Sequence, residues 1–356
     1  MEKVTDLIAA VGDLNAAAMQ AARERQDQLT KPAGSLGVLE QISIRLAGIG
    51  GEVCPTVDKK AVVVMAGDHG VTEEGVSAFP SEVTEQMVYN FINGGAAINV
   101  LSRYVGAEVV VVDMGVKADI DHPLVVGKKV KPGTDNMVKG PAMRREEAEA
   151  AVIAGAEVAA GLIENGIDLL AIGDMGIGNT TAASAIVSVL SGLPVRDVVG
   201  AGTGIDSEVV TAKTYVIETA IKRNRPQPDD PLDVLAKVGG LEIAGLTGVV
   251  LAAAADRVPV VVDGFISGAA ALTAVKLAPQ AVNYMFASHQ SVEPGHRRTL
   301  SEIGLAPMLH MDMRPGEGTG AVLAMNLIEA ASRIIKEMAT FAEAGVSESQ
   351  ESEPVA

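Results

Sequence analysis

The sequence predicts an α/β fold built on a doubly wound, mostly parallel sheet. From Ala61 onward, short runs of β-branched residues are each followed by a glycine-bearing loop and then by an Ala-rich helical stretch. Near-continuous Val and Ile runs are typical of strands buried on both faces, and their alternation with helices favours parallel strands joined by crossover helices. Aromatic residues make up only 3% of the chain and Trp is absent, so the core must be aliphatic.

The expected strands follow one another along the middle of the chain. They cover residues 61–66, 109–112, 169–172, 258–262 and 284–287. In sheets of this kind ligands bind beyond the carboxyl ends of the strands, which is where the glycine-bearing loops fall.

The two ends of the chain predict a small helical domain. Apolar residues recur at helical spacing before residue 50, interrupted by a turn at residues 31–35, and a long helix is expected from Gly318 to about Ala344. We therefore assign residues 1–60 and 325–356 to a helical domain and residues 61–324 to a large α/β domain that carries the active site. The acidic tail, residues 345–356, is expected to be disordered.

Composition excludes several classes of function. The formal net charge of −17 repels nucleic acid, so anionic ligands must be held by local donors, and the 38 glycines make backbone N–H groups the natural candidates. Cys54 is the only cysteine, which excludes an intrachain disulfide. The start of the chain has no signal-peptide pattern, and the longest central apolar run, residues 243–255, is too short to span a bilayer. These features predict a cytoplasmic protein without a membrane segment.

The first candidate loop is the segment 67–70, Gly-Asp-His-Gly, directly after a strand. Asp68 or His69 could face a ligand there, or could serve the geometry of the turn, and the sequence does not decide between these. His69 is better interpreted as a hydrogen-bonded structural residue than as a metal ligand, because the other four histidines lack metal-site spacing.

The second candidate loop, residues 173–181, predicts a phosphate cradle. Its glycines allow close approach of the backbone, and Asn179, Thr180 and Thr181 lie at the start of a helix, whose N-terminus favours an anion. The glycine spacing departs from the dinucleotide fingerprint and no Gly-Lys-Ser/Thr follows. The alternative is a glycine-rich turn capped by Thr.

The third loop, residues 200–206, opens a helix with Asp206 or Ser207 as its N-cap. Lys213 on that helix could supply a cation to a phosphate, although a lone helical Lys is usually a solvated surface residue.

The fourth candidate is the stretch 311–320, which contains Glu317 between two glycines. A carboxylate on such a loop suits proton abstraction if partial burial raises its pKa. Alternatively, Glu317 stabilises the first turn of the following helix as an acidic residue. Spacing alone leaves the two interpretations equal.

Seven motifs together resemble the nicotinate-nucleotide:dimethylbenzimidazole phosphoribosyltransferase family, whose members activate the lower ligand of cobalamin. They are GDHGV, GGAAINVL, IGDMGIGNTTAAS, GAGTGID, VVVDGFISGAAAL, SHQSVEPGH and RPGEGTGA, in the order and at about the spacing found in that family. The resemblance extends from Lys31 to about Met338.

The resemblance implies transfer of phosphoribose from nicotinate mononucleotide to dimethylbenzimidazole, giving nicotinate and α-ribazole phosphate by a single inverting displacement. It also implies a six-stranded, parallel Rossmann-like sheet, a small helical domain made from both chain ends, and a homodimer. No metal or redox cofactor is implied.

The family's functional residues map onto this sequence as follows. The catalytic base corresponds to Glu317, and Asp174 is a second catalytic candidate, where many relatives have the longer Glu. The phosphate site corresponds to Gly176, Gly178, Asn179, Thr180, Gly202, Lys213 and Ser291. The base pocket is expected near Ala78, Phe79, Gln86, Pro315 and Gly316.

Two other functions are compatible with these motifs. The same transfer could use a purine or a phenolic compound as the acceptor. A catalytically silent nucleotide-binding protein on the same fold is less well supported, because Glu317 and the glycine-rich cradle are both present.

Overall fold

The computed structural model describes residues 3–200 and 207–347, and the chain divides into two compact units. The larger contains Met1–Asp13 and Lys59–Met325, and the smaller contains Leu14–Asp58 and Asn326–Ala356. The sequence-based boundary placed all of residues 1–60 in the helical domain. The first thirteen residues belong instead with the larger unit, because helix α1 (Val4–Ala10) contacts α10 (Leu241–Ala255) and has Val4 and Leu7 buried.

A single parallel sheet forms the centre of the larger unit, as predicted. Its strands are β1 (Lys60–Gly67), β2 (Ala107–Gly115), β3 (Val125–Gly127), β4 (Leu169–Met175), β5 (Val260–Val262) and β6 (Met285–Ala287). Their order in the sheet is β3-β2-β1-β4-β5-β6, and every pair is parallel. This is the strand order of a doubly wound dinucleotide-type sheet.

Each of the five predicted strands is present, and their burial explains why the sequence predicted them. All eight residues of β1 are buried, as are all three residues of β5 and of β6. A strand buried on both faces must be apolar at every position rather than at alternate ones. The sixth strand, β3, has only three residues and lies at the sheet edge, so no comparable apolar run predicts it.

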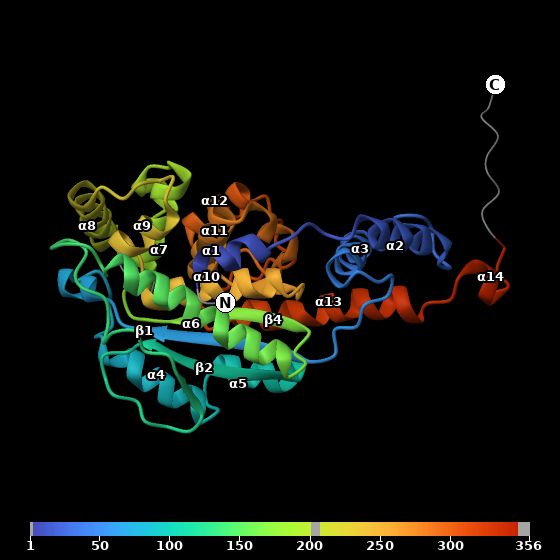
Figure 1. Ribbon diagram of the computed structural model, residues 1–356, viewed down its shortest axis with the longest axis horizontal. Coiled ribbons are helices and arrows are strands. Elements are labelled where there is room, and N and C mark those ends of the chain that lie inside the picture. The colour runs from blue at the N-terminus through green and yellow to red at the C-terminus, as the bar shows by residue number, and fades with distance from the viewer. Residues whose placement is uncertain (1–2, 201–206, 348–356) are drawn as a thin grey trace. The chain divides into compact units, whose positions relative to one another are not determined.

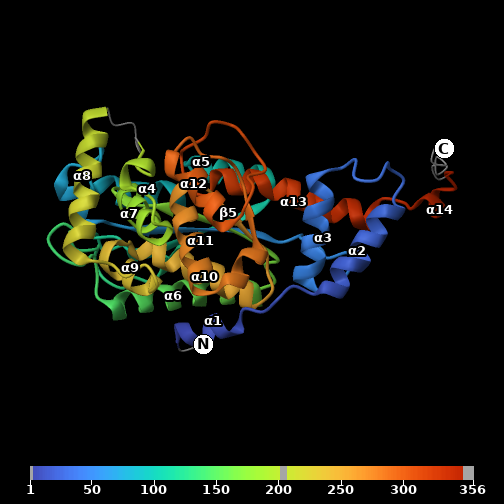
Figure 2. The same ribbon diagram turned by 90° about the horizontal axis from the view of Figure 1, so that it is seen from above.

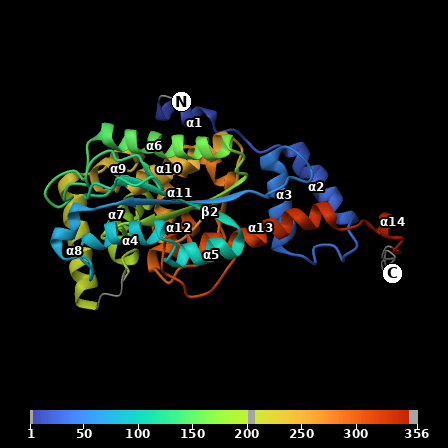
Figure 3. The ribbon, with the colours of Figure 1, turned by 90° about the horizontal axis from the view of Figure 1, so that it is seen from below.

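Helices cover both faces of the sheet (Figures 1 and 3). Helices α6 (Arg145–Glu164) and α10 lie on one face, and α4 (Glu82–Ile92) and α5 (Ala97–Val105) lie on the other. The remaining α-helices of this unit are α7 (Asn179–Ser191), α8 (Ser207–Asn224), α9 (Pro231–Val238), α11 (Phe265–Leu277) and α12 (Pro294–Ile303). Short 3₁₀ turns cover Gly70–Glu74, Val195–Asp197 and Pro279–Tyr284.

Helix α10 contains the longest central apolar run of the sequence. Fourteen of its fifteen residues are buried, so the run forms a core helix. Across the described residues, no helix combines the length and the apolar character that crossing a membrane requires.

The smaller unit is helical. It contains α2 (Ala16–Gln28), α3 (Val38–Gly50), the end of α13 (Thr319–Glu337) and α14 (Phe341–Ala344). Figure 2 shows α2 beside α3. Buried Ala22, Ala47 and Ile335 form its core. The helix predicted to reach Ala344 ends at Glu337, because Thr340 bridges to Leu29 and then caps α14. Residues 348–356 of the predicted tail lie outside the described residues.

The order of the strands fixes where a ligand can bind. Strands β1 and β4 are neighbours, but the chain leaves them toward opposite halves of the sheet. Loops that follow such a pair diverge and leave a crevice at the carboxyl end of the sheet.

Candidate active site

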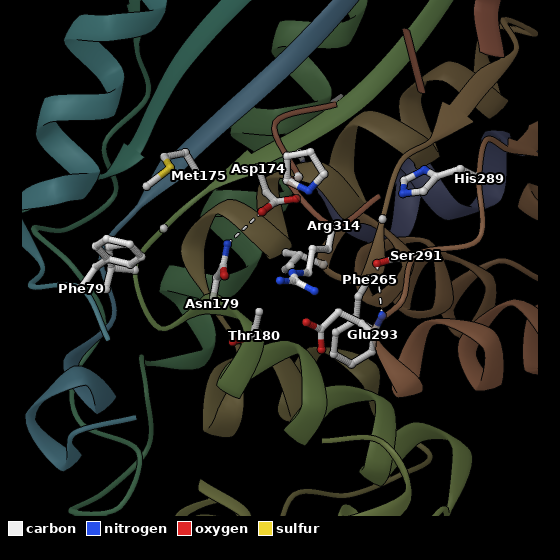
Figure 4. A pocket seen from close by; sticks show the side chains of 16 residues that line it. Phe79, Asp174, Met175, Asn179, Thr180, Phe265, His289, Ser291, Glu293 and Arg314 are labelled. Atoms are coloured by element: carbon white, nitrogen blue, oxygen red, sulfur yellow. Dashed lines mark hydrogen bonds between the residues drawn. The ribbon is translucent and has the colours of Figure 1, made fainter. Parts of the chain in front are cut away.

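A pocket of about 450 Å³ opens at this crevice (Figure 4). It is lined by Phe79, Asp174, Met175, Gly176, Ile177, Asn179, Thr180, Gly264, Phe265, Ile266, His289, Ser291, Glu293, Arg314, Pro315 and Gly316. These residues come from the carboxyl end of β4, from the loops after β1, β4, β5 and β6, from the first turns of α7 and α11, and from the segment before α13. Segments far apart in the sequence therefore meet where the sheet topology predicts.

The loop after β4 supplies one wall of the pocket. Asn179 Nδ2 donates to Asp174 Oδ2 over 2.8 Å, and both side chains are buried. The backbone N–H of Ile177 donates to Thr84 Oγ1 over 3.1 Å, which anchors the turn to α4. Helix α7 begins at Asn179, so its N-terminal N–H groups lie at the pocket, as the phosphate-cradle hypothesis requires.

Lys213 is a buried cation beside this turn. Its Nζ donates to Thr180 Oγ1 over 2.7 Å, and the residue is only 1% exposed. Burial lowers the pKa of Lys213 to about 8, partly opposed by the carboxylate of Glu293. The interpretation as a solvated surface lysine is therefore wrong, and an ammonium group lies next to a residue of the pocket wall.

The loop after β6 supplies the opposite wall. His289, Ser291 and Glu293 line the pocket and are all buried. The Ser291 N–H donates to His296 Nδ1 over 3.0 Å, and Ser291 Oγ accepts from the Glu293 N–H over 3.3 Å. Burial lowers the pKa of His296 to about 3, helped by nearby His289, so this imidazole is a neutral support for the loop.

The loop of Glu317 has an unusual backbone. Gly316, Glu317 and Gly318 have φ values of 75°, 62° and 89°, so three consecutive residues are left-handed. For Glu317 this conformation costs roughly 1 to 2 kcal/mol. The loop lies directly against Gly173 of β4, where a Cβ atom would overlap the Glu317 carbonyl. Strain of this kind is concentrated at functional sites.

The Glu317 carboxyl group is half-buried and adjoins the pocket wall. Its Oε2 accepts from the Ile98 N–H over 3.3 Å at the N-terminus of α5. Burial raises the pKa of Glu317, and the Ile98 hydrogen bond opposes that rise. Pro315 and Gly316 line the pocket, whereas the Glu317 side chain is not among the lining residues.

Two further carboxyl groups lie beneath this loop. Asp263 accepts from the N–H groups of Gly318 (3.1 Å) and Ala321 (2.9 Å), and burial raises its pKa to about 7. Burial also raises the pKa of Asp174 well above its usual range, and nearby Asp263 and Glu242 add to that rise. The site therefore gathers carboxyl groups that can hold protons near neutral pH.

The segment 67–70 has a structural role. His69 Nε2 hydrogen-bonds Glu242 Oε1 over 2.7 Å, and both residues are buried, which confirms the prediction of a hydrogen-bonded histidine. Burial alone would lower the pKa of His69, but the Glu242 carboxylate more than offsets this and the pKa is raised. Asp68 Oδ2 accepts from the Lys117 N–H over 2.8 Å. Neither Asp68 nor His69 lines the pocket.

Most predicted site residues fall at the pocket. Asp174, Gly176, Asn179, Thr180, Ser291, Phe79, Pro315 and Gly316 line it. Gly178 is the N-cap of α7 and does not line the pocket. Ala78 and Gln86 are exposed and do not line the pocket. Gly202 lies outside the described residues.

Sequence reasoning from the residues missed three groups, namely Asp263, His289 and Glu293. All three follow the strands β5 and β6. The rule that ligands bind beyond strand ends could have pointed to Asp263 and His289, because each comes within two residues of a predicted strand.

Comparison with known proteins decides the family. A family model described as "Phosphoribosyltransferase" matches residues 11–346. The chain belongs to this phosphoribosyltransferase family. A Chloroflexus aggregans protein named nicotinate-nucleotide–dimethylbenzimidazole phosphoribosyltransferase is 59% identical, over 99% of this chain and 100% of the relative. A protein of the same name from Desulforudis audaxviator is 56% identical, over 98% of this chain and 99% of the relative.

Solved structures agree with this assignment. A crystal structure of CobT from Thermus thermophilus superposes on this phosphoribosyltransferase with a TM-score of 0.91 and 50% identity. The superposition covers 94% of this chain and all of that chain. The doubly wound fold of the phosphoribosyltransferase is thus shared with a protein of known structure.

Proposed function

We propose that the enzyme transfers the phosphoribosyl group of nicotinate mononucleotide to dimethylbenzimidazole, releasing nicotinate and α-ribazole phosphate. One observation carries this proposal: a helix N-terminus lies at the pocket, a buried lysine donates to Thr180 of its wall, and a cluster of carboxyl groups lies at or next to the same wall. The first two suit a phosphate, and the carboxyl groups suit a nucleophile that must lose a proton. Near full-length similarity to proteins of that name supports these substrates.

The 5′-phosphate belongs at the β4 turn in this proposal. Gly176, Asn179 and Thr180 line the pocket there, and Lys213 donates to Thr180. Ser291 faces the same pocket from the loop after β6. In a protein of net charge −17, this local set of donors offsets the general repulsion of an anionic substrate.

The aromatic acceptor belongs along the apolar side of the pocket. Phe79, Pro315 and Met175, the last residue of β4, line it. An aromatic heterocycle packs well against such groups. Gly316 also lines the pocket and directly precedes Glu317.

Glu317 acts as the general base in this mechanism. One ring nitrogen of the acceptor forms a bond to the anomeric carbon while its N–H nitrogen gives its proton to Glu317. The bond from that carbon to the pyridinium nitrogen breaks, and its electron pair leaves with nicotinate. A raised pKa places the carboxylate nearer the working pH, where a base is most effective.

Asp174 is the second carboxyl group of the proposed site. Its Oδ2 is held by Asn179, and its Oδ1 is buried without a hydrogen-bond partner among the described residues. It lines the pocket next to Gly316, whereas Glu317 is turned toward α5. We propose that Asp174, whose raised pKa favours its protonated form, holds its own proton beside Glu317 while Glu317 accepts the proton of the acceptor, since the two carboxyl groups repel when both are charged.

We also propose that the enzyme is a cytoplasmic homodimer. The dimer rests on the family resemblance, and the compartment on the single cysteine.

The substitution Glu317→Gln tests the general base. Gln keeps the shape of the side chain but takes up no proton, so we expect kcat to fall by about 100- to 10,000-fold with little change in the KM for the nucleotide. Steady-state release of nicotinate measures both constants.

Glu337→Gln serves as the matched control, because Glu337 is an exposed residue at the end of α13 and should leave both constants unchanged. An unchanged kcat in Glu317→Gln removes Glu317 from the mechanism.

A further inference from the structure

His289 is a buried imidazole on the pocket wall that the reaction described above does not use. It lies two residues after β6 and is only 1% exposed. In Figure 4 its ring points toward the interior of the pocket from the side opposite Phe79. What such a ring can bind depends on the hydrogen bonds that its two nitrogens already make.

The position of the ring is fixed by its neighbours. A Cβ atom on Gly320 would overlap His289 Nδ1, so the ring packs directly on the first turn of α13. Asp263 Oδ1 lies 3.7 Å from Nδ1. The ring therefore has little freedom to turn, and its two nitrogens have distinct surroundings.

The hydroxyl group of Ser288 and the carboxyl group of Asp263 favour one tautomer of His289. Ser288 Oγ donates to the carbonyl oxygen of Asp263 over 3.1 Å, and it lies 3.0 Å from His289 Nδ1. A hydroxyl group has one proton to donate. When that proton is donated to the Asp263 carbonyl, Nδ1 carries a hydrogen and donates to Ser288, and the Asp263 carboxyl group 3.7 Å away favours the same tautomer. Nε2 is then unprotonated and can only accept a hydrogen bond.

Nε2 has no hydrogen-bond partner among the described residues, although it is buried. Leaving a buried acceptor unsatisfied costs about 1 to 3 kcal/mol. Burial also lowers the pKa of His289, which keeps the ring neutral. The pocket thus presents a fixed acceptor that requires a hydrogen-bond donor from a ligand.

The N–H of the aromatic acceptor is directed to Glu317 in the proposed mechanism, and within the nucleotide only one kind of group can donate to Nε2. The ionised phosphate and carboxylate of nicotinate mononucleotide accept hydrogen bonds, and the pyridinium ring has no N–H. Its two ribose hydroxyl groups are the donors. Ser291, a proposed phosphate contact, lies two residues beyond His289, so the sugar attached to that phosphate falls near the ring.

We infer that His289 Nε2 accepts a hydrogen bond from a ribose hydroxyl group of the nucleotide and so orients the sugar for attack at its anomeric carbon. The inference rests on the proposed function, because the ribose comes from that donor. It adds a contact on the side of the pocket opposite the aromatic acceptor.

Two substitutions separate the nitrogens of His289. In His289→Asn the amide nitrogen replaces the Nδ1 donor but nothing replaces Nε2, whereas in His289→Gln the amide oxygen reaches the position of Nε2. We measure kcat/KM with nicotinate mononucleotide and with its 2′-deoxy and 3′-deoxy analogues, with dimethylbenzimidazole as the acceptor. His310→Asn is the control, because His310 is exposed and does not line the pocket.

For the wild type, we expect one deoxy analogue to lose about 10-fold or more in kcat/KM, the value of one hydrogen bond to a site group. His289→Asn should lose a similar factor with the full nucleotide and should no longer distinguish it from that analogue. His289→Gln should recover much of the activity and the discrimination.

Two results would overturn the inference. One is a wild-type kcat/KM that is equal for the nucleotide and both analogues. This result does not depend on whether any variant folds. The other is a His289→Asn enzyme whose kcat/KM falls with the deoxy analogue by the same factor as that of the wild type, in addition to the loss that the substitution itself causes. Failure of the wild type to form any α-ribazole phosphate would instead contradict the proposed function.

Discussion

Lys213 is a residue whose charge should change within the working pH range. Its burial beside Thr180 lowers its pKa to about 8, so the ammonium form predominates below that pH and is lost above it. If Lys213 attracts the phosphate, the KM for the nucleotide should rise as pH increases through 8, by up to about 10-fold per pH unit.

Lys213→Met tests this dependence. Met fills a similar volume without charge, so the variant should have a high KM that no longer rises between pH 8 and 10. Lys222→Met, an exposed position on the same helix, should keep the wild-type profile. A Lys213→Met enzyme with the wild-type slope would assign the pH dependence to another group.

Individual residues differed in how well the sequence predicted them. Asn179 and Thr180 were legible because a glycine-rich turn at a strand end is a local pattern. The sequence left open whether Lys213 is buried or solvated, because a position in a helix does not indicate which other elements pack over it. In the structure Lys213 is fully buried. The tautomer of His289 depends on its hydrogen bond with Ser288 and on the contact of Ser288 with Asp263, and the sequence does not show these contacts.

At the scale of elements, the start of α13 depends on Asp263 at the end of β5. Its carboxyl group accepts from the N–H group of Gly318, directly before the helix, and from that of Ala321 in its first turn. A helix N-terminus leaves such N–H groups without partners within the helix. Asp263 therefore secures both the helix and the Glu317 loop that precedes it.

Asp263→Ala should lower the free energy of unfolding by about 1 to 3 kcal/mol, because two buried N–H groups lose their acceptor. Asp263→Asn retains one acceptor oxygen, so its stability should fall between those of the wild type and Asp263→Ala. Urea denaturation followed by circular dichroism measures the change.

Asp256→Ala provides the comparison, since Asp256 is exposed after α10. Equal stability of the Asp263 and Asp256 variants would show that the buried cap does not stabilise α13.

The elements themselves were predicted unevenly. Strands buried on both faces carry unbroken apolar runs, so β1, β4 and β5 were visible in the sequence. The edge strand β3 has three residues and no such run. The last helix was predicted too long, because helical spacing continues past Glu337 and only the pairing of Thr340 with Leu29 shows where the chain leaves the helix.

At the scale of the whole chain, the order of the strands explains why one pocket collects residues from so many loops. The sequence predicts parallel strands and places ligands at their carboxyl ends, but it does not give the order β3-β2-β1-β4-β5-β6, since neighbours in the sheet are not neighbours along the chain. That order puts the loops after β1 and β4 on either side of the crevice, and those after β5 and β6 beside it.

The anomeric configuration of the product tests the central claim most directly. The wild-type enzyme is incubated with nicotinate mononucleotide and dimethylbenzimidazole, and the products are quantified by chromatography and examined by NMR. A single displacement at the anomeric carbon predicts one nicotinate for each ribazole phosphate, all of it in the α configuration. A β-configured product, or nicotinate released without any ribazole phosphate, would contradict the account.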